Sequence, residues 1–154
     1  MARIEFNLPD DFNEKLKKLE GEEFRRISET ALERAARVVL EASRSELKRV
    51  LDSNRDSRST GELLASLGVS PVDISLKNGY LNVSVGFNEP RRKQTAAKKK
   101  RSYNVATNAM IAAVLEYGRH GQPARPFMSR ARNRSKKAAL DELEWVFMEE
   151  MDKL

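Results

Sequence analysis

Few residues in this chain are of the types that carry out catalysis. The sequence contains one histidine, His120, and no cysteine, which excludes a thiol nucleophile, a disulfide framework and a metal site built from several histidines or thiolates. It also lacks a P-loop, a dinucleotide-binding glycine motif, a GxSxG nucleophile elbow and an HExxH zinc motif. A lone histidine in a loop is more often a surface residue than a catalyst. We therefore expect no enzymatic activity, no cofactor, no bound metal and no small-molecule substrate.

Among the carboxylates, Glu116 stands apart. Most acids alternate with lysine and arginine on predicted helix faces, a pattern typical of solvated surface pairs, whereas Glu116 lies in the apolar segment 105–117. A buried carboxylate needs a hydrogen-bonding partner, and the arginines nearby in the sequence are the candidates. We expect a structural rather than a catalytic role for Glu116.

Positive charge is concentrated in one part of the chain. Residues 91–137 contain 14 lysine and arginine side chains and a single acid, whereas residues 1–90 and 138–154 are both net negative. Such a segment favours an anionic partner, either nucleic acid or an acidic protein surface, although a solvated loop is the alternative at its start. Only Tyr103 flanks the basic stretch as a stacking aromatic, so any nucleic-acid contact would be with phosphates and independent of sequence. The candidate partner or phosphate contacts are Arg91, Arg92, Lys93, Lys98, Lys99, Lys100 and Arg101.

The length of 154 residues fits a single domain, 1–154, which can bury a hydrophobic core without disulfides or metals. No apolar run approaches the ~20 residues that a membrane span requires. The first ten residues do not resemble a signal peptide. These features, with the absence of cysteine, predict a cytosolic protein that makes no membrane contact.

Apolar spacing predicts two helices in the first third of the chain, a short one at 8–20 and a long one at 22–51. The long helix carries a single apolar stripe, so one face should lie on the core and the other in solvent. A polar loop follows. The sequence STGE then fits a capping box with Ser59 as N-cap, which predicts a short helix through Leu67 that ends at Gly68.

A β-hairpin is predicted with its turn at Asn78-Gly79, the preferred pair for a two-residue type I′ turn. With this turn, apolar residues face apolar residues and polar residues face polar residues at every pair. A shift of one residue would scramble that pattern. The predicted pairs of the apolar face are Leu76 with Leu81, Ile74 with Val83, and Val72 with Val85, and we expect all six side chains to be buried together.

The second half of the chain is predicted to contain a flexible basic loop at 88–104 and two helices. The apolar segment 105–117 is rich in alanine, methionine and leucine, which favours a buried helix, and Gly118 is its natural C-cap. Pro126 suits the first position of a last helix that runs to about Lys153. The predicted fold class is α+β, with a small antiparallel β-sheet, centred on the hairpin, packed against a long N-terminal helix and a C-terminal helix.

One stretch, VLEYGRHGQPARPFMSRA at 114–131, resembles the signature of the small neck and tail-completion proteins of long-tailed bacteriophages, which include tail components and head–tail joining proteins. A second match is TGELLASL at 60–67, which is similar to the Gly-x-Leu-x-x-Ser stretch before the sheet of that family. The resemblance extends from residue 22 to residue 154, whereas the helix at 8–20 and the lysine-rich loop depart from the family pattern. The signature positions are Glu116, Tyr117, Gly118, Pro123, Ala124, Arg125, Pro126 and Phe127.

The resemblance implies a structural virion protein of the phage or prophage neck. It would dock onto neighbouring neck and tail proteins and onto copies of itself, with a six-fold ring as the best guess, after assembly in the bacterial cytoplasm. The main alternative is a non-specific nucleic-acid-binding protein that uses the basic segment 91–137. Independently of the family, a glycine followed by two prolines fits either a rigid elbow or an ordinary connection between two helices, and the resemblance is what favours the elbow.

The charges of the predicted last helix are split between its halves. Bases occupy its first half and acids its second, which is opposite to the arrangement that the helix dipole favours. Either the helix is simply solvated, or the basic end of one subunit faces the acidic end of the next. The candidate subunit-interface residues are Arg130, Arg132, Arg134, Glu149 and Glu150.

Overall fold

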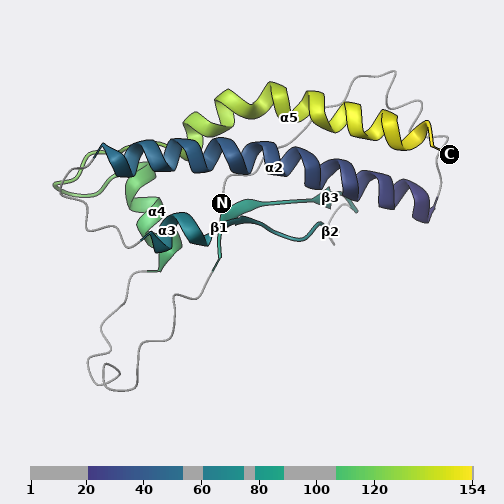
Figure 1. Cartoon of the computed structure of the whole chain (residues 1–154). Helices are drawn as coiled ribbons and strands as arrows, with labels where there is room; N and C mark the ends of the chain where they lie inside the picture. The colour runs from purple at the N-terminus through teal and green to yellow at the C-terminus, as the bar shows by residue number, and fades with distance from the viewer. Residues whose placement is uncertain (1–20, 54–60, 75–78, 89–106, 154) are drawn as a thin grey trace, which may run out of the picture.

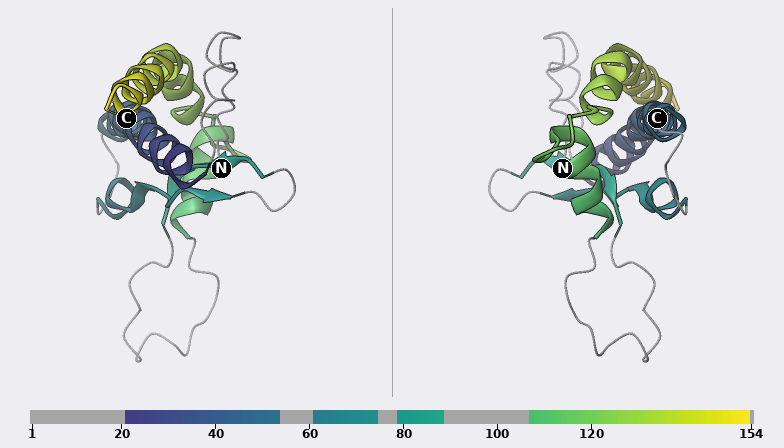
Figure 2. Two further views of the ribbon diagram at one scale, coloured as in Figure 1. Left: turned by 90° about the vertical axis from the view of Figure 1, so that its right-hand side faces the viewer. Right: turned by 90° about the vertical axis from the view of Figure 1, so that its left-hand side faces the viewer.

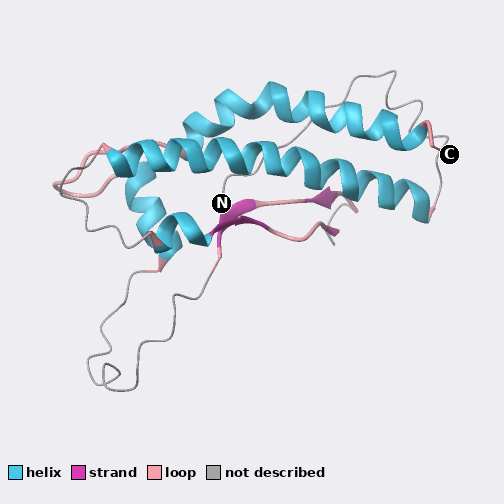
Figure 3. Cartoon of the chain, in the orientation of Figure 1, coloured by secondary structure: helices cyan, strands magenta, loops and turns pink. Residues whose placement is uncertain are grey.

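The computed structural model describes residues 21–53, 61–74, 79–88 and 107–153. The predicted helix at 8–20, the predicted N-cap Ser59, the strand residue Leu76 and the basic loop beyond Asn88 lie outside the described residues. The described part confirms the α+β fold class, with long helices at both ends of the described chain and short antiparallel strands between them (Figure 3).

Three layers make up the fold (Figure 1). Helix α2 (Glu22–Asp52) lies in the middle, helix α5 (Met128–Met151) packs antiparallel along one side of it, and the strands lie on its other side. The end-on views show the same order of layers (Figure 2). The long helix predicted at 22–51 is therefore confirmed, but α2 is covered on two sides rather than on the one face that its apolar stripe predicted.

Small and apolar side chains allow α2 and α5 to approach closely. Ala31 and Ala35 of α2 and Ala139 of α5 are almost completely buried. Near the α2 N-terminus, the ring of Phe24 meets the ring of Phe147 edge to face, with centroids 6.1 Å apart. This packing fixes the two helices as one unit along their length.

The strands form a hairpin with an irregularity in its middle. Strand β1 (Leu67–Val69) pairs with β4 (Val85–Phe87), and β2 (Asp73–Ile74) pairs with β3 (Leu81–Asn82). Between the two ladders, one arm contains three residues, 70–72, and the other contains only two, 83–84. The extra residue is a β-bulge, and Pro71, which has no N–H to contribute to a ladder, lies within it.

The predicted register of the hairpin is wrong. Ile74 pairs with Leu81 rather than with Val83, and Val85 pairs with Val69 rather than with Val72. The prediction assumed an unbroken ladder closed by a two-residue turn at Asn78-Gly79, whereas the pairing of Ile74 with Leu81 differs from that register by two residues. The predicted common burial is also incomplete: Val85 is buried, and Val72, Ile74, Leu81 and Val83 are half-buried.

Helix α3 (Glu62–Ser66) begins and ends differently from the prediction. Its N-cap is Gly61, which has a φ of +75° and makes no side-chain capping bond, so the capping box with Ser59 at the N-cap is wrong. Leu67 is already extended and buried at the start of β1, because its side chain belongs to the core. Gly68 therefore lies inside a strand, opposite Gly86, rather than at a helix end.

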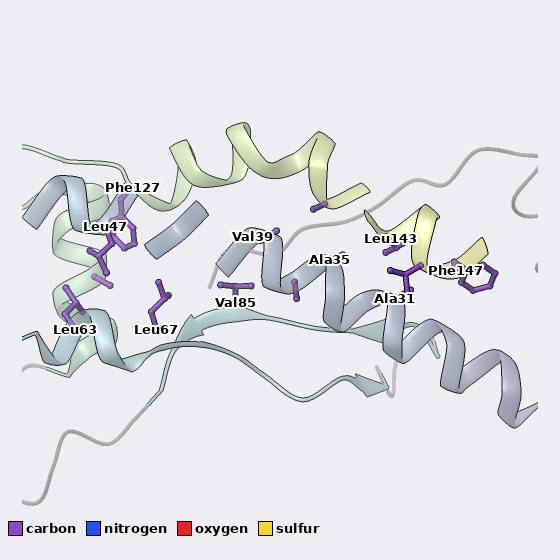
Figure 4. Packing of buried hydrophobic residues seen from close by; sticks show 14 of the residues in the cluster. Ala31, Ala35, Val39, Leu47, Leu63, Leu67, Val85, Phe127, Leu143 and Phe147 are labelled. Carbon is purple, nitrogen blue, oxygen red and sulfur yellow. The ribbon is translucent and has the colours of Figure 1, made fainter. Parts of the chain in front are cut away.

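Helix α4 (Asn108–Tyr117) confirms the helix predicted at 105–117, but it begins later and is buried along one side only. Thr107 is its N-cap, and the Thr107 hydroxyl accepts a hydrogen bond from the Met110 N–H at 3.2 Å. The core runs from the end of α2, where α3, α4 and the hairpin meet, to the contact between α2 and α5 (Figure 4). Phe127, Leu47, Leu63 and Leu67 fill its first part, and Phe147 lies in its second part.

Candidate functional site: the elbow between α4 and α5

The elbow consists of residues 116–129 and contains every position of the sequence signature. Helix α4 ends at Gly118, whose φ of +77° is a left-handed conformation that favours glycine. A side chain would not fit there. A Cβ atom on Gly118 would lie 2.8 Å from the backbone nitrogen of Ala124 and 2.9 Å from the carbonyl oxygen of Gln122. Gly118 is thus required both by its backbone conformation and by the return of the chain beside it.

Backbone hydrogen bonds close the loop of the elbow. Arg119 and Gln122 exchange two bonds, with N–O distances of 3.0 and 2.9 Å, which makes a tight turn at the tip. The N–H of Arg125 then donates to the carbonyl oxygen of Leu115, 2.7 Å away and inside α4. This last bond joins the returning chain to α4, eight residues after the helix ends at Tyr117.

The carboxylate of Glu116 caps the N-terminus of α5. Its Oε2 accepts hydrogen bonds from the N–H groups of Phe127 at 2.8 Å and Met128 at 2.9 Å, and its Oε1 accepts from the N–H of Ser129 at 3.0 Å and from the Ser129 hydroxyl. The first N–H groups of a helix have no partner within it, and the helix dipole makes this end attractive to an anion. Glu116 therefore supplies from α4 the cap that α5 does not supply for itself.

This arrangement corrects two expectations. The partners of Glu116 are backbone N–H groups and a serine, not the nearby arginines. Helix α5 begins at Met128 with Phe127 as N-cap, so Pro126 precedes the cap instead of occupying the first helical position. The reason is that Glu116 engages the N–H groups of residues 127–129 and thereby fixes where the helix begins.

The pKa of Glu116 reflects two opposing influences. Burial removes water from the carboxylate, and this desolvation, the largest single influence, raises the pKa. The hydrogen bond from the Ser129 hydroxyl and those from the backbone N–H groups of Met128, Ser129 and Phe127 lower it. Together these bonds outweigh desolvation, so the pKa of Glu116 lies below its ordinary value and the group is ionised at neutral pH.

Phe127 attaches the elbow to the core. Its side chain is fully buried, and its ring meets the ring of Phe87 in β4 edge to face, with centroids 6.0 Å apart. The elbow is therefore fixed at three points: the cap by Glu116, the contact of Arg125 with α4, and the anchor of Phe127 in the hairpin. The signature residues form one structural unit, which sets the angle between α4 and α5.

The outer surface of the elbow is open to solvent. Tyr117 is 81% exposed, and Arg119 and His120 at the tip are exposed as well. Among the described residues, no group of three histidine, cysteine or acidic side chains is placed to hold a metal ion. The exposed side chains of Tyr117 and Arg119 offer a partner an aromatic ring and a positive charge.

The candidate subunit-interface residues are divided between internal ion pairs and the surface. Arg134 pairs with the buried Glu46 of α2, while Glu149 and Glu150 pair with Lys153 at 3.4 and 2.6 Å. Arg130 and Arg132 are exposed. The seven candidate basic contacts at 91–101 lie outside the described residues.

The sequence did not predict the roles of two side chains, Glu46 and Ser129. Glu46 is 1% exposed although it lies in a helix among charged residues, and Ser129 was not distinguished from other serines. The apolar residues on both sides of Glu46 along the stripe of α2 were the available signal for its burial. For Ser129 no signal was available, because its role depends on a partner thirteen residues away.

No helix within the described ranges is both long and apolar enough to cross a membrane. The described residues form an α+β structure in which two antiparallel helices and a hairpin hold the elbow at one end.

A family model described as "Bacteriophage HK97-gp10, putative tail-component" matches residues 10–118, and the chain belongs to this family of phage tail components. The predicted resemblance to phage neck and tail proteins is therefore confirmed. No curated protein and no solved structure matches the chain. The match begins at residue 10, so it includes most of the segment 8–20 that the sequence analysis had treated as a departure. It ends at Gly118, so it contains the Glu-Tyr-Gly half of the signature and not the half from Pro123 to Phe127.

Proposed function

We propose that this protein is a non-enzymatic structural subunit of the virion that joins the capsid to the tail or completes the tail. It would act in the neck by docking onto neighbouring neck and tail proteins and onto copies of itself in a ring, after assembly in the bacterial cytoplasm. Membership of the tail-component family supports a structural role in the phage particle. The elbow supports the more specific role.

The observation that carries the proposal is the capping of α5 by Glu116. A subunit that repeats around a ring must present its contact surfaces at one angle, because a small angular error accumulates at each copy and prevents closure. The three attachments of the elbow hold α4 at one angle to α5. Since the solvent side of the same elbow carries Tyr117 and Arg119, a rigid internal structure there supports an exposed contact surface.

The test is electron microscopy of particles produced when the gene is deleted from the phage or prophage that carries it. We expect separate filled heads and tails, or tails with an incomplete end, and normal particles when the gene is supplied in trans. Labelled antibody against the protein should decorate the junction of complete particles. Joined, normal particles from the deletion would overturn the proposal.

A second candidate function, sequence-independent binding of nucleic acid, is favoured by one observation. The first half of α5 exposes Arg130, Arg132, Lys136 and Lys137, and no acid interrupts them. Binding driven by phosphate contacts weakens steeply as salt increases, with a logarithmic slope of about −0.9 for each phosphate neutralised on duplex DNA. Replacing two of these bases by glutamine should reduce the slope by about two. A slope that does not change would exclude this face as the DNA contact.

A further inference from the structure

The charges of α5 give the pair of helices α2 and α5 two ends of opposite charge. The acid-rich first turn of α2, with Glu22 and Glu23, lies at the same end as the acid-rich second half of α5 (Figure 1). At the other end, Lys48 and Arg49 near the end of α2 lie where α5 begins. The bases of the α5 first half are Arg130, Arg132, Arg134, Lys136 and Lys137. Each half of α2 contains as many acids as bases, so the opposite charges of the two ends come from α5.

The positive end also carries an apolar helix face in contact with solvent. One half of α4 packs on the core, whereas Met110, Ala113 and Tyr117, which recur at helical spacing on another side, are exposed. Met110 is 57% exposed and Tyr117 is 81% exposed. Two large exposed side chains on one short helix, with basic residues at the tip of the adjoining loop, are typical of a protein-binding surface.

The negative end carries an exposed aromatic residue of its own. Trp145 is 56% exposed, and Met148 lies one helical turn further along α5. The guanidinium group of Arg34 lies 5.9 Å from the centre of the Trp145 ring, which holds the ring on the surface of the helix pair. Exposed acids, Asp141 and Glu149, lie four residues before and after Trp145.

We propose that these two surfaces bind each other in neighbouring copies of the chain, so that the Trp145 surface of one copy seats on the α4 face of the next. This inference rests on the proposed ring function and names the surfaces that would form the ring contact. The apolar and aromatic residues supply the buried centre of the contact, and the opposite charges around them fix its direction.

Charge selects a second copy in this head-to-tail orientation. Two α4 faces would bring positive surfaces together, and two Trp145 surfaces would bring negative surfaces together, so a symmetric pairing of like ends is disfavoured by repulsion. A contact between unlike ends leaves one binding surface open at each end of the pair. Such a heterologous contact adds further copies and closes into a ring when the rotation permits.

Cross-linking between cysteine variants tests the contact directly, because the sequence contains no cysteine. Ala113→Cys places a thiol on the α4 face, and Met148→Cys places one beside Trp145, while Tyr117 and Trp145 remain intact. The two variants, one of them enlarged by a fusion so that the products differ in size, are mixed and treated with a bismaleimide. We expect a mixed cross-linked dimer, and only trace dimer from either variant alone.

Tyr117→Ser should decrease the yield of the mixed dimer severalfold, because truncating a central aromatic residue of an interface weakens binding by about tenfold or more. Tyr80→Ser is the matched control. Tyr80 is also a well-exposed tyrosine, but it lies on the hairpin, so its replacement should leave the yield unchanged. Trp145 is the only tryptophan, and its fluorescence should shift to shorter wavelength as the protein concentration rises.

Several outcomes would overturn the contact. Equal cross-linking of Ala113→Cys with itself would indicate a symmetric α4 pairing. A thiol at position 113 that resists maleimide in the dilute monomer would indicate that the chain itself covers this face. If no mixed dimer forms while deletion of the gene still leaves heads and tails separate, this contact is wrong and the proposed function stands. If the mixed dimer forms but the deletion gives normal particles, the proposed function is wrong instead.

Discussion

Replacing Glu116 by glutamine tests whether the elbow is held by the carboxylate. Glutamine preserves the size of the side chain but turns one acceptor oxygen into an amide nitrogen, which is a donor. If that nitrogen faces the N–H groups of Phe127 and Met128, two hydrogen bonds are lost. If it faces Ser129, the bond from the Ser129 N–H is lost, while the hydroxyl can turn to accept from the amide. The remaining bonds also lose the benefit of a negative charge at a helix N-terminus.

The expected cost follows from these contacts. A hydrogen bond to a charged group contributes about 1.5–3 kcal/mol, and loss of a helix N-cap costs about 0.5–2 kcal/mol. Because some of the freed N–H groups can reach water, we expect Glu116→Gln to lower the free energy of unfolding by about 2–4 kcal/mol. For a chain of this size, that corresponds to a decrease in melting temperature of about 4–16 °C.

The measurement is urea unfolding followed by circular dichroism, with Asp141→Asn as control. Asp141 is an exposed acid on α5, so removal of its charge should change the stability by no more than about 0.5 kcal/mol. Ser129→Ala, which removes only the hydroxyl donor, should cost about 1 kcal/mol. A Glu116→Gln variant as stable as the Asp141→Asn control would refute the capping role of Glu116.

The effect of Glu116→Gln should also depend on pH. The pKa of Glu116 is lowered in the folded state, so the stability contributed by its ionised form is fully present above its unfolded pKa, about 4.3, and is lost as the pH falls through the folded pKa. The stability difference between wild type and variant should therefore be constant near pH 7 and shrink below about pH 4. A difference that grows on acidification would show that the sign of the shift is wrong.

Three further predictions concern the elbow and the helix pair. Gly118→Ala should destabilise the fold by about 2–4 kcal/mol, because it combines a left-handed backbone with a clash against Ala124. Gly121→Ala, with a φ of +75° and open space around it, should cost about 1 kcal/mol. Thermal unfolding of both variants separates the cost of the clash from the cost of the backbone strain. Phe127→Ala should cost about 3–5 kcal/mol in chemical unfolding, since the side chain is fully buried. Arg134→Ala should cost about 1–3 kcal/mol, because it leaves Glu46 buried with only the longer 3.5 Å contact to Arg49. Glu46→Met, in contrast, should be neutral or stabilising. If both variants cost the same in chemical unfolding, the ion pair of Arg134 with Glu46 stabilises the fold more than an apolar contact would.

The elements of the fold could be predicted to the extent that local sequence determines them. The apolar stripe of α2 gave its bounds within one residue, and the left-handed Gly118 marked the end of α4. The register of the hairpin could not be derived in this way. The inner ladder is already two residues away from the register that a two-residue turn at Asn78-Gly79 imposes, and the bulge at residues 70–72 shifts the outer ladder by one residue more. A bulge changes which residues face each other while leaving local preferences almost unaltered.

The site was predicted as a set of residues but not as a mechanism. The signature drew attention to Glu116, Gly118 and Phe127, and the structure places all three in one unit. The partner of Glu116 was wrong for a physical reason: the sequence shows charged side chains, so arginine is the obvious counterpart of a buried acid. The N–H groups at the start of a helix carry a comparable attraction for an anion, but no residue type identifies them.

The two halves of the signature, Glu-Tyr-Gly and Pro-Ala-Arg-Pro-Phe, therefore act together. The family match ends at Gly118, yet the carboxylate of Glu116 binds the backbone of residues 127–129, beyond that end. Backbone N–H groups are present whatever the side chains, so the second half can vary in sequence as long as it returns a helix N-terminus to the same place. What must stay fixed in the second half is its geometry: a loop that Gly118 permits, a bond back to α4 at Leu115, and an apolar anchor at Phe127. Replacing residues 119–124 by another loop of equal length should then preserve the angle between α4 and α5, whereas lengthening the loop by one residue should not.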